Sequence, residues 1–239
     1  MMCDNPAATL DRDPPLPMTT IFLIRHGEST TNAGKRTSDP KAVGLSQKGK
    51  TQARALVQKL KALRISNVYC SAMPRTQLTA APFLKDQKKT FTTLEIEEFS
   101  YLAPEETKNT TEGERAKLED ALWEHRDPNR CTPGGETFAA LLKRVDAFLK
   151  ILPTLPDRSA CFGHGYFFAT LIARTHFPRD SAVEMIGHVH RRIVSNNQQM
   201  GNTDIAEAHT KSSNVEPIRW PDVGPRVEVK HSPTYCQRL

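Results

Sequence analysis

Short apolar runs alternate along this chain with longer stretches in which apolar residues recur every three or four positions. Runs at residues 21–24, 68–70 and 159–162 are rich in residues that favour strands and are short enough to predict buried strands. Helical periodicity is clearest over residues 46–63 and 138–152, where it predicts amphipathic helices with one face in the core. This alternation predicts an α/β fold, a three-layer α/β/α sandwich around a mostly parallel sheet.

Residues 91–99 predict a further strand. Ile96 and Glu98 fall on its apolar face, while Glu95 and Glu97 point the other way. A carboxylate aligned with the apolar side of a strand should be partly desolvated, which raises its pKa and suits a general acid. Glu98 is therefore the candidate acid. The alternative is that all three glutamates merely solvate the strand.

The chain of 239 residues is long enough for one sizeable α/β domain, which we place at residues 18–214. Residues 1–17, with several prolines and aspartates, predict a disordered extension, and residues 215–239 predict an irregular tail. Within the domain, the acidic stretch 107–127 predicts a lid-like insertion with a helix over 112–125. Three of this helix's apolar side chains are expected to face the core: Leu118, Leu122 and Trp123.

The composition narrows the classes of partner. The formal net charge is +6, but the basic residues are spread along the chain and are not interleaved with aromatic ones, which argues against nucleic acid and fits a bias toward anionic substrates. No apolar stretch approaches the roughly 20 residues of a membrane span, and no secretion signal is visible at the N-terminus, so cytoplasm is the expected compartment. Five scattered cysteines support neither a disulfide framework nor a zinc site.

Polar groups follow the ends of the predicted strands. Arg25 and His26 come directly after the first strand, Arg75 lies in the first turn of the helix after the second, and His164 stands between two glycines after the last. Glu98 ends the 91–99 strand. Because open α/β sheets bind ligands at the carboxyl ends of their strands, we expect these side chains to meet. Arginine beside histidine suits an anion clamp next to a nucleophile or base, although a solvated Arg25 and a structurally satisfied His26 are the alternative.

Residues 20–32, a strand followed by Arg-His-Gly-Glu-Ser-x-x-Asn, resemble the signature of the histidine phosphatase superfamily, the phosphoglycerate-mutase-like enzymes. Further stretches are similar to the family in the same order, from the helix start at Leu45-Ser46-x-x-Gly49 to the Asn202-x-x-Ile205 segment. Between them lie four more similar stretches: Ser71-x-x-x-Arg75, the Glu98 segment, Gly134-Gly135-Glu136-Thr137 and Gly163-His164-Gly165. In the first of these, we expect Ser71 to cap the helix that carries Arg75.

This resemblance implies a metal-independent phosphomonoester hydrolase without a cofactor. His26 would form a phosphohistidine and Glu98 would act as general acid and base. The phosphoryl group would be held by five residues: Arg25, Asn32, Arg75, His164 and Gly165. The expected partner is a phosphorylated small molecule or phosphoprotein, and the oligomeric state is open.

Two alternatives remain at this point. One is a cofactor-dependent mutase, although the loop around Asn32 lacks the tryptophan and the aromatic, glycine-containing stretch that such mutases carry. The other is a non-catalytic scaffold that retains the fold.

Overall fold

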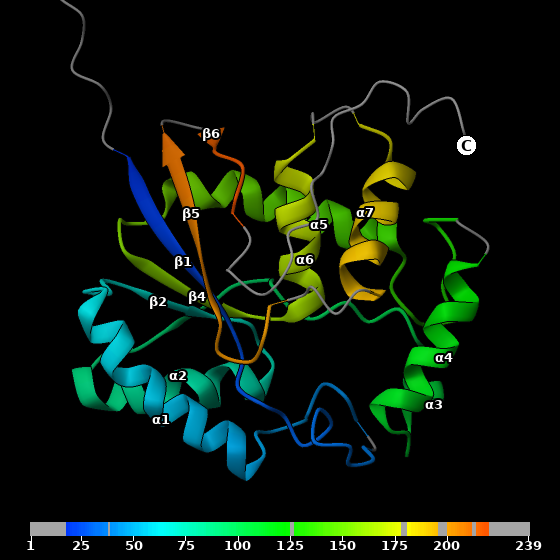
Figure 1. Ribbon diagram of the computed structural model, residues 1–239, viewed down its shortest axis with the longest axis horizontal. Coiled ribbons are helices and arrows are strands. Elements are labelled where there is room, and N and C mark those ends of the chain that lie inside the picture. The colour runs from blue at the N-terminus through cyan, green and yellow to red at the C-terminus, as the bar shows by residue number, and fades with distance from the viewer. Residues whose placement is uncertain are drawn as a thin grey trace, which may run out of the picture.

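The structure is a computed structural model in which the chain forms a sheet with helices on both faces (Figure 1). It describes residues 18–37, 39–124, 127–177, 181–195, 200–211 and 214–219. The predicted N-terminal extension and most of the predicted tail lie outside these residues. None of the helices within the described ranges is long and apolar enough to cross a membrane.

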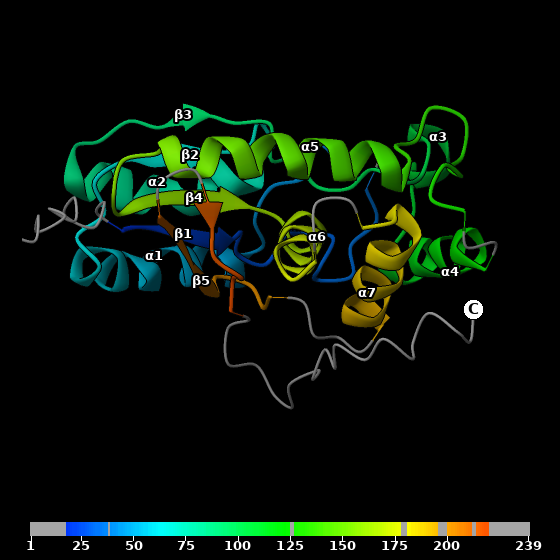
Figure 2. The same ribbon diagram turned by 90° about the horizontal axis from the view of Figure 1, so that it is seen from above.

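The central sheet has six strands in the order β3-β2-β4-β1-β5-β6, and Figure 2 shows this sequence from β3 at one edge to β5. The first four in this order are parallel, whereas β5 and β6 run antiparallel to their neighbours. The prediction of a mostly parallel sheet is therefore confirmed. The strands are β1 (Thr19–Arg25), β2 (Val68–Cys70), β3 (Thr92–Thr93), β4 (Ser159–Gly163), β5 (Ile205–Lys211) and β6 (Asn214–Val215).

Helices cover the two faces of this sheet and complete the predicted three layers (Figure 1). The side chains of β1 alternate: Phe22 and Ile24 pack toward α1 and α2, while Ile21 and Leu23 pack toward α5 and α6. This alternation follows from the period of two along a strand. The helices are α1 (Gln47–Ala62), α2 (Pro74–Gln87), α3 (Pro104–Thr107), α4 (Glu112–Trp123), α5 (Phe138–Ile151), α6 (Gly165–Thr175) and α7 (Val183–Ser195), with a 3₁₀ turn at Leu152–Thr154.

The strand predicted over residues 91–99 is wrong for most of its length. Pairing with β2 ends at Thr93, after which the Leu94 amide still donates to the Cys70 carbonyl (2.9 Å). Beyond that point the chain leaves the sheet and passes toward the start of α6. Glu98 is thus placed by an irregular segment and not by the face of a strand.

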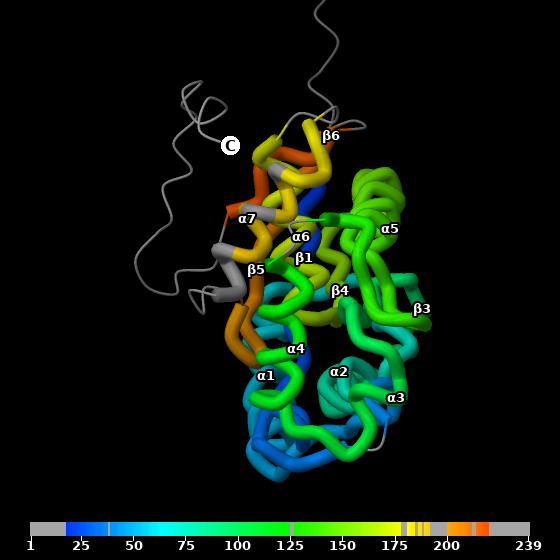
Figure 3. Tube along the Cα trace, turned by 90° about the vertical axis from the view of Figure 1, so that its right-hand side faces the viewer, coloured from blue at the N-terminus to red at the C-terminus, as the bar shows by residue number. Residues whose placement is uncertain are grey.

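The predicted insertion, residues 107–127, forms α4, and α3 ends where the insertion begins. Both helices lie on the side of the molecule that faces the viewer in Figure 3. Of the apolar side chains expected to face the core from its helix, Trp123 packs against the core. Leu118 does not: it is 40% exposed, whereas its neighbour Glu119 is 6% exposed. At the C-terminal end of the domain, the boundary predicted after residue 214 falls inside β6, and Ile218 is buried against the core.

Candidate active site

The backbone at the end of β1 is fixed from two sides. The His26 amide donates to the Gly163 carbonyl of β4 (3.1 Å), and the Asn202 side-chain amide donates to the His26 carbonyl (3.0 Å). The Asn202-x-x-Ile205 segment noted in the sequence therefore lies directly beside His26. Both contacts hold the peptide that carries the imidazole, so the side chain leaves the strand in one direction.

Two glycines allow α1 to approach the turn that follows His26. A Cβ added to Gly49 would lie 2.0 Å from the Glu28 carbonyl oxygen, and one added to Gly27 would lie 2.9 Å from the Gly49 carbonyl oxygen. Ser46 caps α1 and its hydroxyl also donates to the Glu28 carboxylate (2.7 Å). The start of α1 thus fits against this turn only because both positions lack a side chain.

The His26 imidazole has a defined tautomer. Its Nδ1 lies 2.7 Å from the Gly27 carbonyl oxygen, which can only accept, so Nδ1 carries the proton. Its Nε2 accepts a hydrogen bond from Arg75 Nε (3.2 Å). Burial lowers the pKa of His26 well below its ordinary value, and the charges of Arg75 and Arg25 lower it further. The ring is therefore neutral at pH 7, with the Nε2 lone pair facing the site.

Two guanidinium groups supply the positive charge of the site. Arg75 stands in the first turn of α2, as predicted, and also donates to the Pro40 carbonyl (2.9 Å). Burial lowers its pKa to about 10, which leaves it charged at pH 7. Arg25 donates from Nη1 to the Met200 carbonyl, and its buried Nε has no hydrogen-bond partner among the described residues.

His164 lies at the end of β4, with its ring centroid 5.2 Å from that of His26. Although two glycines flank it in the sequence, His164 has a side-chain partner, because its Nε2 lies 2.7 Å from Ser71 Oγ. Its Nδ1 is buried and has no hydrogen-bond partner within the described part of the chain. Burial lowers the pKa of His164 well below its ordinary value, as do Arg75, His26 and Arg25.

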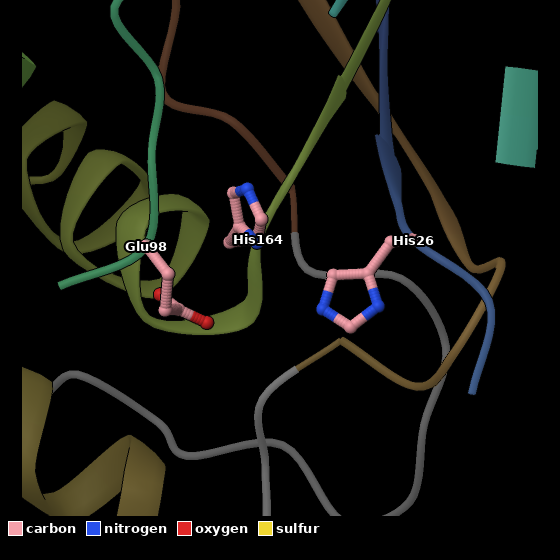
Figure 4. A group of neighbouring side chains, drawn as sticks. All are labelled: His26, Glu98 and His164. Atoms are coloured by element: carbon pink, nitrogen blue, oxygen red, sulfur yellow. The ribbon is translucent and has the colours of Figure 1, made fainter. Parts of the chain in front are cut away.

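The Glu98 carboxylate lies at the N-terminus of α6, as Figure 4 shows. Its Oε1 accepts from the amides of Tyr166 (3.0 Å), Phe167 (3.2 Å) and its own neighbour Phe99 (3.1 Å). Burial raises its pKa above the ordinary value, against the opposing effect of the two arginines and these amides. The raised pKa is the property that the sequence predicted, but burial in an irregular segment produces it, and not the apolar face of a strand.

His26, Glu98 and His164 each offer a ligand atom, and these atoms lie within 4.8 Å of one another. Such a group could hold a metal ion by distance alone. However, the charges of both Arg25 and Arg75 act on His26 and Glu98, and they would repel a cation. The same two charges attract a phosphoryl group, so the electrostatics favour an anion here.

Of the two remaining predicted binding residues, Gly165 lies beside the histidines and Asn32 lies in a separate loop. Gly165 begins α6 directly after His164 and thus lies in the site. Asn32 is held by the loop before α1: its Oδ1 accepts from the Ser29 amide (3.2 Å), and its Nδ2 donates to Glu112 of α4 (3.2 Å). Within the described part of the chain, no contact places Asn32 with the two histidines.

The loop before α1 contacts the insertion. Thr37 pairs with Thr110 as an isolated bridge, and Arg36 forms an exposed ion pair with Glu114 (2.7 Å). Next to them, an open cavity of about 430 Å³ is lined by Glu98 and, among others, Lys41 and Ser100. The loop before α1 and the insertion therefore meet through polar contacts.

Sequence reasoning missed several residues of this region. Ser71 is not the cap of α2, which begins after Met73 without a side-chain cap, but a partner of His164. Glu119 of α4 is buried, and its carboxylate accepts from the Tyr166 hydroxyl (3.0 Å). Arg144 of α5 contacts the segment that carries Glu98. Only distant contacts connect these residues, so no local pattern could have identified them.

Comparison with known proteins now gives the class. The family model described as "Histidine phosphatase superfamily (branch 1)" matches residues 21–193. The chain therefore belongs to the histidine phosphatase superfamily, and the resemblance seen in the sequence is confirmed.

Individual relatives share only a modest part of their sequence with this chain. A protein of Photorhabdus laumondii named "Probable phosphoglycerate mutase GpmB" is 26% identical over 200 residues, which cover 78% of this chain and 85% of that protein. A protein of Schizosaccharomyces pombe named as a probable phosphatase is 37% identical over 65 residues, only 27% of this chain and 31% of that protein.

Solved structures confirm the fold. A mycobacterial glucosyl-3-phosphoglycerate phosphatase has a TM-score of 0.64 at 18% identity and covers 87% of this chain and 100% of its own. The α-ribazole phosphatase of Shigella flexneri has a TM-score of 0.64 at 21% identity and covers 87% and 99%. At these identities the similarity establishes the α/β fold of this chain.

Proposed function

We propose that this protein hydrolyses phosphomonoesters through a phosphohistidine intermediate on His26, with Glu98 as general acid and base. The observation that carries the proposal is the state of His26. Its Nδ1–H is held by a carbonyl, and its Nε2 lone pair faces the buried guanidinium of Arg75. A neutral imidazole in that orientation is a nucleophile beside an anion clamp.

In the first step His26 Nε2 attacks phosphorus while the bond from phosphorus to the alcohol oxygen breaks. Arg25, Arg75 and His164 hold the equatorial oxygens, where charge develops. Glu98, whose pKa is raised by burial, transfers its proton to the departing alcohol oxygen. The products are a phosphohistidine, a free alcohol and a Glu98 carboxylate.

In the second step the Glu98 carboxylate takes a proton from water as the water oxygen attacks phosphorus. The bond from phosphorus to His26 Nε2 breaks, inorganic phosphate leaves, and both side chains return to their starting states. An open cavity beside Glu98 gives the departing alcohol room next to its acid.

The main alternative is transfer of the phosphoryl group to a second alcohol. The Photorhabdus relative supports this alternative, because it is named as a probable phosphoglycerate mutase. The two activities separate on a phosphoglycerate: a hydrolase releases phosphate, whereas a mutase needs a bisphosphorylated primer and releases little.

The first experiment measures phosphate release from para-nitrophenyl phosphate, in EDTA, by wild type and His26→Ala. We expect release by the wild type alone and, after rapid quenching, a phosphoenzyme that is labile in acid and stable in alkali. A phosphoglycerate with and without primer is the matched assay for the mutase. If neither aryl nor natural monoesters react and no phosphoenzyme forms, the scaffold alternative replaces the enzyme.

A further inference from the structure

The irregular segment that carries Glu98 is held by an ion pair on α5. Glu136 precedes α5, and Arg144 lies within it. Arg144 Nε and Nη2 donate to the two carboxylate oxygens of Glu136 at 2.7 and 2.9 Å. Both side chains are mostly covered, with 24% and 18% exposed. A paired, bidentate contact of this kind fixes the geometry of both partners more tightly than a single ion contact.

This pair contacts the chain on both sides of Glu98. On one side, Arg144 Nη1 donates to the Glu97 carbonyl (3.2 Å). On the other, the Ser100 amide donates to the Glu136 carboxylate (3.3 Å), and the Glu136 amide donates to the Ser100 carbonyl (2.7 Å). Three hydrogen bonds therefore bracket the residue whose carboxylate faces the two histidines.

The same arginine also touches the other support of that carboxylate. Its guanidinium lies 5.3 Å from the ring centroid of Phe167, and the Phe167 amide donates to Glu98 Oε1. Arg144 thus contacts both the segment that carries Glu98 and the helix turn that binds its carboxylate. No strand fixes this segment, so these contacts replace the register that a sheet would supply.

We infer that Glu136 and Arg144 are positioning residues that hold Glu98 where it can protonate the leaving alcohol. This inference rests on the proposed role of Glu98 as general acid. Both side chains line the cavity beside Glu98, and among the described residues neither forms a hydrogen bond with His26 or His164. Their loss should therefore impair proton transfer and leave the attack of His26 largely intact.

Proton transfer can be separated from attack by changing the leaving group. A nitrophenolate departs without a proton, whereas the alkoxide of benzyl alcohol must be protonated as it leaves. A displaced general acid consequently slows benzyl phosphate far more than para-nitrophenyl phosphate, although both substrates carry one aromatic ring. A purely structural defect lowers the amount of active enzyme and slows both substrates equally.

The decisive variant is Arg144→Lys, which keeps the positive charge and loses the planar fork. Glu136→Gln tests the other partner. Asp146→Asn is the matched control, because Asp146 lies on the same helix and pairs with an arginine (Arg174, 2.8 Å) without contacting the Glu98 segment. Glu98→Gln is the reference for complete loss of the acid.

For Arg144→Lys and Glu136→Gln we expect kcat/KM to fall about 10- to 100-fold on benzyl phosphate and less than about 3-fold on para-nitrophenyl phosphate, a fraction of the full contribution of a general acid. Asp146→Asn should leave the ratio of the two substrates unchanged. Equal losses on both substrates, or none, would overturn the inference.

The reference variant separates this inference from the proposed function. If Glu98→Gln shows no selective loss on benzyl phosphate, Glu98 is not the acid, and the inference falls with that role. If Glu98→Gln shows the loss but Arg144→Lys does not, the role of Glu98 stands and the inference alone is wrong.

Discussion

Removing the hydroxyl of Ser71 tests how the second histidine is used. Ser71 Oγ lies 2.7 Å from His164 Nε2 and also accepts from the Met73 amide (3.2 Å). The neighbouring Thr76 hydroxyl lies 3.0 Å from Ser71 Oγ, and it can direct its own proton to the Met73 carbonyl (2.8 Å). Ser71 can thus donate its proton to His164 Nε2, which places the imidazole proton on Nδ1. A donor at Nδ1 is what a phosphoryl oxygen requires.

Ser71→Ala leaves His164 Nε2 buried without a partner, and a buried acceptor in that state costs about 1–3 kcal/mol. The ring can then adopt the other tautomer, in which Nδ1 no longer donates. If the full cost appears in the transition state, kcat/KM falls about 5- to 160-fold, because 1.36 kcal/mol corresponds to a factor of ten.

The assay is kcat/KM for para-nitrophenyl phosphate together with inhibition by vanadate, which probes the phosphate site alone. Thr76→Val is the control, since it removes the other hydroxyl near Ser71 but no contact with His164. Thermal unfolding of both variants reports stability. A folded Ser71→Ala enzyme within about 2-fold of Thr76→Val in kcat/KM and vanadate affinity would refute the proposed tautomer and its role.

Three further predictions follow from burial and close approach. In the pH profile of kcat/KM, the acid limb should lie well below pH 6.5, because the pKa of His26 is lowered and its neutral form persists. The alkaline limb should vanish in Glu98→Gln, because Glu98, whose pKa is raised, loses its proton as the pH rises. Gly49→Ala, whose Cβ would meet a carbonyl oxygen at 2.0 Å, should cost about 1–3 kcal/mol of stability in urea unfolding, whereas Gly113→Ala, with nothing within 4 Å, should cost none. Because burial raises the pKa of Glu119 in the folded protein, the free energy of unfolding should fall as the pH rises through that pKa. In urea unfolding at pH 4 and pH 7, Glu119→Gln should show a smaller decrease in this free energy than the wild type.

The sequence was sufficient to predict the layers and the placement of four polar groups. The apolar runs of β1, β2 and β4 are local signals of buried strands, and parallel strands bring their carboxyl ends to one edge. That topology alone explains why Arg25, His26, Arg75 and His164 come together. Their roles in catalysis stay predictions, as does that of Glu98.

The remainder depends on contacts that no window of sequence contains. Glu98 was selected from a strand pattern, but its surroundings come from α6 and α5, which lie about 40 to 70 residues further along. Glu119 is buried in place of Leu118 because the hydroxyl of Tyr166 on α6 donates a hydrogen bond to its carboxylate. Hydrophobic periodicity assumes that charges stay outside, and it fails where such a distant donor is present.

Under the proposed mechanism, the hydrogen bond between Arg75 and His26 explains how the nucleophile becomes available. In the free site Arg75 Nε–H points at the Nε2 lone pair, the same lone pair that must attack phosphorus. A phosphoryl oxygen is a better acceptor for a guanidinium than a neutral imidazole, because the contact is assisted by two opposite charges. A bound phosphoryl group therefore competes for Arg75 and leaves the Nε2 lone pair directed at phosphorus. One arginine thus serves both to orient the free imidazole and to hold the group that it attacks.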